Sequence, residues 1–170
     1  GIGDACDGSS FAPDITVIDP VDPANDLIVP MGDILDDLAS NKTITVRNDG
    51  NDNLSLGAIG TPNALAEPFS VGNDTCSGQI LAPMATCTFD IHFASIPKGT
   101  FTDTFTLPSN DPDEGSVTIN VNGRKKEALY AYVVNSGDHT ITKIRVYDDV
   151  VVGTYPIGSA GLGVAVAPDG

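Results

Sequence analysis

The stretch Thr86-Cys-Thr-Phe-Asp-Ile-His-Phe93 alternates strictly between polar and apolar side chains. Its aromatic and branched side chains, Phe89, Ile91 and Phe93, therefore fall on one face of an extended chain. Because successive side chains of a β-strand point to opposite sides, a period of two indicates a strand with one buried face. Half-buried strands of this kind are typical of antiparallel sheets.

Three further stretches show the same alternation, at residues 42–47, 102–107 and 116–122. Segments rich in Asn, Asp, Gly and Pro separate the strands, and these residue types favour turns. Several short strands at this spacing predict an Ig-like antiparallel β-sandwich over residues 13–123. Within it, Gly32-Asp-Ile-Leu-Asp-Asp-Leu-Ala39 is the one segment that we expect to form a short helix.

The charge and the apolar runs of the chain exclude two classes of function. The 170 residues include 23 Asp and Glu against 8 Lys and Arg, which gives a formal net charge of −15. Binding to nucleic acid through a basic face needs clustered Lys and Arg, and the one basic cluster, at 124–126, is too small. No run approaches about 18 apolar residues, so we expect no membrane insertion.

Residues 124–127, Arg-Lys-Lys-Glu, interrupt the pattern and predict a linker. Four more β-like runs follow it, at 129–134, 140–147, 150–155 and 163–167. They predict a separate four-stranded antiparallel sheet over residues 128–170. The fold class expected for the whole chain is therefore all-β.

Residues 13–123 resemble the bacterial Ig-like module of the ASH / choice-of-anchor D type. The residues that carry the resemblance are Ile44–Asn51, Phe69–Val71, Cys76–Cys87, Thr88–Phe93, Gly99–Phe101 and Pro108–Asp113. The sequence departs from the family at Met84-Ala85, where Gly-Ala is usual. The resemblance implies a module or scaffold more often than a catalyst.

Two shorter pieces also resemble known modules. Residues 128–170 are similar to one blade of a YVTN-type β-propeller, through Tyr132–Asp138, Pro156–Gly158 and Gly163–Gly170. Residues 1–12 resemble the tail of a thrombospondin type 3 calcium repeat, through the Gly-Ile-Gly-Asp-Ala-Cys-Asp order of residues 1–7. Together these families imply a secreted or surface-displayed bacterial or archaeal protein.

The chain has three cysteines, Cys6, Cys76 and Cys87. Cys76 and Cys87 are either a disulfide or a metal or redox pair, and their spacing does not fit zinc, which takes two close pairs of ligands. We expect the disulfide, which indicates an oxidising, extracellular or cell-surface location. Cys6 then pairs with a cysteine outside this sequence, cross-links to another chain, or stays free.

Calcium is the one ligand that the sequence favours, and no cofactor is required. The thrombospondin resemblance implies that Asp4 and Asp7 are calcium ligands, although a complete site needs more oxygens. The loops at 48–53 and 110–114 are also rich in oxygen ligands, but we interpret them as ion-free turns. His92 and His139 are far apart, and we expect both at the surface. We therefore expect no catalytic residues and no enzyme activity.

The predicted C-terminal sheet leads to the functional hypothesis. A segment of this length cannot bury both faces of a sheet alone, and open edges invite pairing with another strand. We therefore expect residues 128–170 to pack on other copies, or on other surface proteins, and to build an extracellular fibre or surface assembly. The alternative is an N-terminal piece of a longer secreted β-propeller that binds a ligand or mediates adhesion. A weaker alternative is an enzyme with its active site on further blades.

Overall fold

The structure is a computed structural model that describes residues 11–35, 38–94 and 98–158. The chain divides into two units, Gly1–Lys126 and Glu127–Gly170. Each unit is a β-structure, and the described residues contain no helix. The all-β expectation is therefore confirmed.

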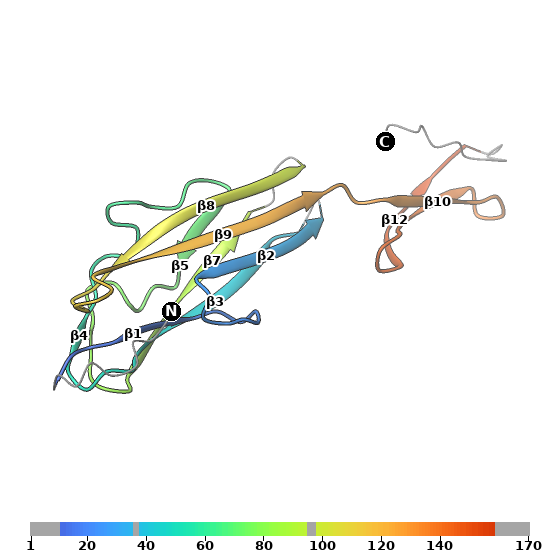
Figure 1. Cartoon of the computed structure of the whole chain (residues 1–170). Helices are drawn as coiled ribbons and strands as arrows, with labels where there is room; N and C mark the ends of the chain where they lie inside the picture. Colours follow the sequence, from blue (N-terminus) through green and yellow to red (C-terminus); the bar gives the residue numbers. More distant parts are fainter. Residues whose placement is uncertain (1–10, 36–37, 95–97, 159–170) are drawn as a thin grey trace. The chain divides into compact units, whose positions relative to one another are not determined.

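The first unit is a sandwich of two sheets (Figure 1). One sheet has the order β1-β3-β7-β5, and all its pairs are antiparallel. The other has the order β2-β9-β8, in which β2 runs parallel to β9 and β8 runs antiparallel to it. The bounds are β1 Ile15–Ile18, β3 Ser40–Asn48, β5 Phe69–Gly72, β7 Thr86–Phe93, β2 Ile28–Leu35, β8 Gly99–Pro108 and β9 Ser116–Lys126. A short pair, β4 Leu54–Ser55 and β6 Ile80–Leu81, completes the unit.

The core lies between the two sheets and is built from the apolar half of each alternating strand. Phe89 on β7 meets Phe105 on β8 edge-to-face, with ring centroids 5.8 Å apart. Phe93 stacks on Phe69 at 4.9 Å. Gly123 on β9 faces Phe93, and a Cβ on this glycine would lie 2.6 Å from the ring. A glycine is therefore needed at 123 for the Phe93 ring to fill this part of the core.

The helix expected at 32–39 is wrong for the residues that the structure describes there. Gly32–Leu35 continue β2 and pair with Gly123–Lys126 of β9. The register shifts between Pro30 and Gly32, and Gly32 has a positive φ of 78°. This β-bulge places Met31 and Ile34 in the core although they are three residues apart, which imitates helical spacing.

The linker was expected at residues 124–127, but in the structure Arg124–Lys126 are the last residues of β9. Lys125 is buried, and its Nζ donates to the carbonyl oxygen of Leu35 at the end of β2. Lys126 forms an ion pair with Asp33. The basic cluster is therefore part of the sandwich, where Lys125 and Lys126 contact β2. The boundary between the two units falls after it.

The second unit contains an antiparallel sheet of three strands in the order β10-β11-β12. Their bounds are β10 Tyr130–Asn135, β11 Thr140–Arg145 and β12 Val150–Pro156. The fourth strand expected at 163–167 lies outside the described residues. None of the described residues from 127 to 158 is buried. This sheet has no core of its own within the part that the structure describes.

Candidate functional site

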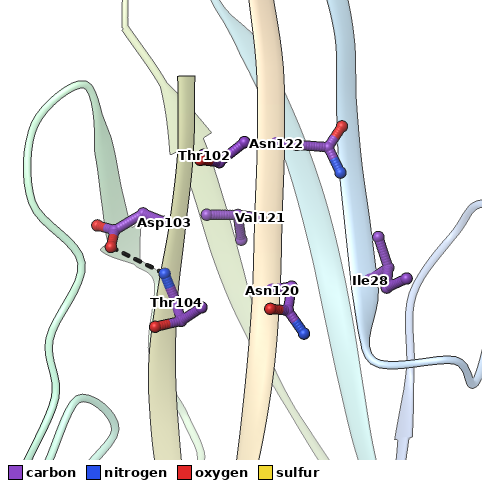
Figure 2. Close-up of a pocket in the computed structure, with 7 residues that line it drawn as sticks. All are labelled: Ile28, Thr102, Asp103, Thr104, Asn120, Val121 and Asn122. Atoms are coloured by element: carbon purple, nitrogen blue, oxygen red, sulfur yellow. Dashed lines mark hydrogen bonds between the residues drawn. The ribbon is translucent and has the colours of Figure 1, made fainter. Parts of the chain in front are cut away.

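A shallow depression lies on the outer face of the β2-β9-β8 sheet (Figure 2). Its floor and rim are lined by Ile28, Thr102, Asp103, Thr104, Asn120, Val121 and Asn122. Asp103 is the one titratable residue in this lining, and its carboxylate accepts from the backbone N–H groups of Thr104 and Ala66, both at 2.8 Å. The depression therefore exposes the hydroxyl and amide groups of threonines and asparagines, while the Asp103 carboxylate is hydrogen-bonded to the backbone.

A richer polar region lies where three loops meet at the start of β9. We call it the loop end, and it consists of residues 12–14, 48–53 and 109–115. Backbone bonds join the first two loops, from Asp49 N to Asp14 O at 2.8 Å and from Asn51 N to Ala12 O at 3.0 Å. Residues that are distant in the sequence are thus fixed side by side.

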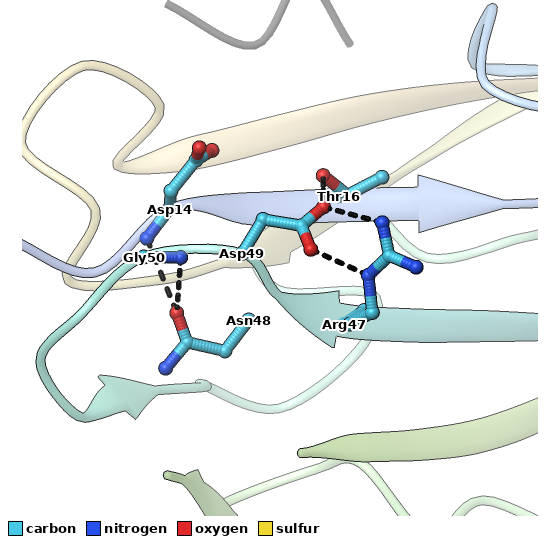
Figure 3. A network of polar contacts seen from close by, with 6 residues as sticks. All are labelled: Asp14, Thr16, Arg47, Asn48, Asp49 and Gly50. Atoms are coloured by element: carbon cyan, nitrogen blue, oxygen red, sulfur yellow. Dashed lines mark hydrogen bonds and ion pairs between the residues drawn. The ribbon is translucent and has the colours of Figure 1, made fainter. Parts of the chain in front are cut away.

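Asn48 is the hub of the loop end (Figure 3). Its side-chain oxygen accepts from the N–H groups of Gly50 at 3.1 Å and Asp14 at 3.3 Å. Its side-chain nitrogen donates to the carbonyl oxygens of Asp52 at 2.7 Å and Leu81 at 2.9 Å. These four hydrogen bonds use both acceptor positions and both N–H groups of the Asn48 side chain, which is fully buried. The side chain therefore shapes the turn.

Asp49 is bound on two sides (Figure 3). It forms a two-point ion pair with Arg47, at 2.5 and 2.8 Å, and it accepts from the Thr16 hydroxyl at 2.6 Å. The hydrogen bond from Arg47 is the main reason that the pKa of Asp49 lies below its usual value. This carboxylate stays ionised and pins β1 to the end of β3.

Three carboxylates gather next to this network. The side-chain oxygens of Asp14, Asp111 and Glu114 all lie within 4.8 Å of one another. Burial, and then the charge of Asp111, raise the pKa of Glu114. Three carboxylates supply part of the six to eight oxygens that a calcium ion takes. However, Asp111 already accepts from the N–H groups of Ile15, Asp113 and Glu114.

The sequence did not predict that Asp14, Asp111 and Glu114 lie close together. The loop at 110–114 was recognised as oxygen-rich, but Asp14 stands almost a hundred residues away and lies in no motif. It comes next to Asp111 because β1 begins there and its first N–H, that of Ile15, bonds to the Asp111 carboxylate. Asp4 and Asp7, the calcium ligands implied by the thrombospondin resemblance, lie outside the described residues. So does Cys6.

Cys76 and Cys87 form a disulfide, with an S–S distance of 2.01 Å and Cα atoms 5.2 Å apart. Both residues are buried. The bridge fixes the loop after β5 to the start of β7, and three hydrogen bonds join Thr75 to Thr88 beside it. The structure thus supports a disulfide rather than a metal or redox pair at these cysteines.

The two histidines differ in their surroundings. His139 is exposed in the turn between β10 and β11. His92 on β7 is half-buried and lies across Gly72 of β5, where an added Cβ would meet its Nε2 at 2.3 Å. His92 therefore packs on the sheet more closely than a solvated surface residue would.

In the described part of the chain, no helix is long and apolar enough to cross a membrane.

Fold and geometry define an Ig-like β-sandwich followed by a small sheet. The family model of the HYDIN/CFA65/VesB-like Ig-like domain matches residues 27–124, which is more than half of the chain. The chain therefore belongs to this family of Ig-like domains. No curated protein matches the chain.

Several solved structures are similar to this chain. A protein of unknown function from Porphyromonas gingivalis W83 is 15% identical, with a TM-score of 0.51 over 65% of this chain and 46% of its own. The Vibrio cholerae VesB protease is 19% identical, with a TM-score of 0.46 over 58% and 30%. The ASH / PapD-like domain 7 of human CEP192 is 10% identical, with a TM-score of 0.49 over 76% and 98%. This chain thus spans less than half of the first two proteins, and these likenesses concern the fold alone.

Proposed function

We propose that this chain is a non-enzymatic, secreted or cell-surface structural module that assembles with other copies through its C-terminal sheet. The observation that carries the proposal is the absence of any buried residue among the described residues 127–158. Side chains that a folded unit would normally cover, such as Val133, Val151 and Tyr155, are 44%, 57% and 50% exposed.

The energetics of a small sheet favour a partner. Covering apolar surface contributes about 25 cal/mol for each Å² removed from water, and this sheet gains little of it alone. Three strands need an apolar face packed on something to be stable independently. In addition, β10 and β12 each leave one edge unpaired within the described sheet, and open edges accept a further strand.

Two observations support a structural role outside the cytoplasm. The buried Cys76–Cys87 disulfide favours an oxidising compartment. At the loop end, the side chains of Asn48, Asp49 and Asp111 are used in hydrogen bonds that shape the loops. Calcium binding at Asp4 and Asp7, and cross-linking through Cys6, remain predictions.

The alternative function also has support. The meander order β10-β11-β12 is the order of strands within a propeller blade, as the YVTN resemblance implies. In that case the exposed faces would pack on further blades of a longer secreted protein that binds a ligand or mediates adhesion.

Light scattering coupled to size-exclusion chromatography separates the two functions. The test compares the 170-residue chain with a chain of residues 11–126, which keeps the whole sandwich core. We expect the mass of the full chain to rise with concentration, with elongated particles in negative-stain images, while the shortened chain stays monomeric. A full chain that remains monomeric up to millimolar concentration would contradict assembly and favour the propeller.

A further inference from the structure

The four tyrosines of the chain all lie between residues 130 and 155. The register of the sheet places three of them on one face. Tyr132 is directly opposite Lys143, which is opposite Gly153, and Ile141 is opposite Tyr155. Directly opposed residues of an antiparallel pair share a face. We call this surface the tyrosine face, and its members are Tyr130, Tyr132, Val134, Ile141, Lys143, Arg145 and Tyr155.

Both cations of the second unit, Lys143 and Arg145, belong to the tyrosine face. The Lys143 Nζ lies 3.7 Å from the centroid of the Tyr130 ring, which holds the charge against the sheet. Arg145 is bound to Asp148 at 2.8 Å. The opposite face carries Val133, Ile144 and Val151 beside a row of threonines, without a cation. Positive charge and aromatic surface are thus concentrated on one side.

The rest of the chain is strongly acidic. Residues 1–126 contain 18 acidic and 6 basic residues, whereas residues 127–170 contain 5 and 2. The loop end alone carries six carboxylates, those of Asp14, Asp49, Asp52, Asp111, Asp113 and Glu114. Arg47 pairs with one of them, Asp49. Both units are acidic overall, so attraction between two copies is confined to places where Lys143 and Arg145 of a tyrosine face meet carboxylates such as those of the loop end.

We propose that the tyrosine face docks on the loop end of a second copy, so that assembly is head-to-tail. The inference rests on the proposed function and specifies its contact. Tyrosine and arginine are enriched at the centres of protein interfaces, and the Lys143 charge would reduce the repulsion between Asp111 and Glu114. The tyrosine face supplies the apolar area, and the loop end supplies the opposite charge.

The contact joins two different surfaces of the same chain, the tyrosine face of one copy and the loop end of the next. Each added copy therefore presents a further tyrosine face or loop end to another copy. A heterologous contact of this kind extends into a filament or ring.

The test pairs charge reversals with light scattering. Lys143→Glu should raise the Kd of association at least tenfold, while Lys143→Arg should associate like the wild type. Arg124→Glu is the matched control, because Arg124 is exposed on the sandwich and its reversal changes the net charge equally. Asp52→Lys with Asp113→Lys, two exposed positions of the loop end, should also raise Kd at least tenfold.

Mixing the two defective chains tests the head-to-tail geometry. The Lys143→Glu chain keeps an intact loop end, and the Asp52→Lys/Asp113→Lys chain keeps an intact tyrosine face. At a concentration above the wild-type Kd and below that of either variant, we expect each to be monomeric alone and the mixture to form a 1:1 dimer that grows no further. The docking contact is overturned if Lys143→Glu associates like the wild type, if Arg124→Glu weakens association equally, or if the mixture stays monomeric. A monomeric wild-type chain would overturn the proposed function as well, so the two failures are distinguishable.

Discussion

The carboxylate of Asp111 accepts a hydrogen bond from the backbone N–H of Ile15 at 2.8 Å, although 96 residues separate the two. Ile15 begins β1 in one sheet, and Asp111 lies in the loop that leads into β9 of the other. The same carboxylate accepts from the N–H groups of Asp113 at 3.0 Å and Glu114 at 3.2 Å. One buried side chain therefore holds a loop in shape and fastens it to the opposite sheet.

Asp111→Ala should lower the free energy of unfolding by about 1–3 kcal/mol, because it leaves buried backbone N–H groups without an acceptor. Urea unfolding measures this change. Asp113→Ala, at an exposed position two residues along, is the matched control and should change stability by less than about 0.5 kcal/mol. Equal effects of the two substitutions would contradict the role given to Asp111.

Glu114 makes the sandwich sensitive to pH. Burial and the Asp111 charge raise its folded-state pKa above the ordinary value of 4.5, so the folded chain binds this proton more tightly than the unfolded chain. The resulting stabilisation is complete below the unfolded pKa and is lost as pH rises through the folded pKa. Glu114→Gln should therefore match the wild type in acid and exceed it by about 0.5 kcal/mol at neutral pH, a small gain because solvent screens the site.

Urea unfolding at a series of pH values tests the Glu114 effect. Glu67→Gln, at an exposed position before β5, is the control and should change stability little at any pH. A Glu114→Gln gain that is the same in acid and at neutral pH would show that titration of this carboxyl is not its cause.

The disulfide should contribute substantially to the stability of the sandwich. Cys76→Ala with Cys87→Ala should lower the free energy of unfolding by about 2–3 kcal/mol, because the bridge restricts the unfolded chain over a loop of 11 residues. Intact mass before and after reduction, followed by alkylation, checks that the bond forms. Two thiols that alkylate freely without a reductant would refute the pairing.

Strands whose pattern is purely local could be predicted from the sequence. Thr86–Phe93 has the observed bounds of β7, because each apolar residue simply faces the core. β2 was missed because its bulge at Gly32 shifts the pattern, and because its partner β9 lies far along the chain and runs parallel. The loop end was missed for a similar reason. The contact between Ile15 and Asp111 depends on how two sheets stack, which no local spacing records.

Hydrogen exchange at two protein concentrations tests most directly the central claim that the C-terminal sheet is covered by other copies. We expect the backbone amides of residues 130–156 to exchange more slowly at high concentration and to lose this protection on dilution. The amides of β3 and β7, which lie inside the sandwich sheet, should exchange at the same rate at both concentrations. Exchange of residues 130–156 that does not depend on concentration would contradict the claim.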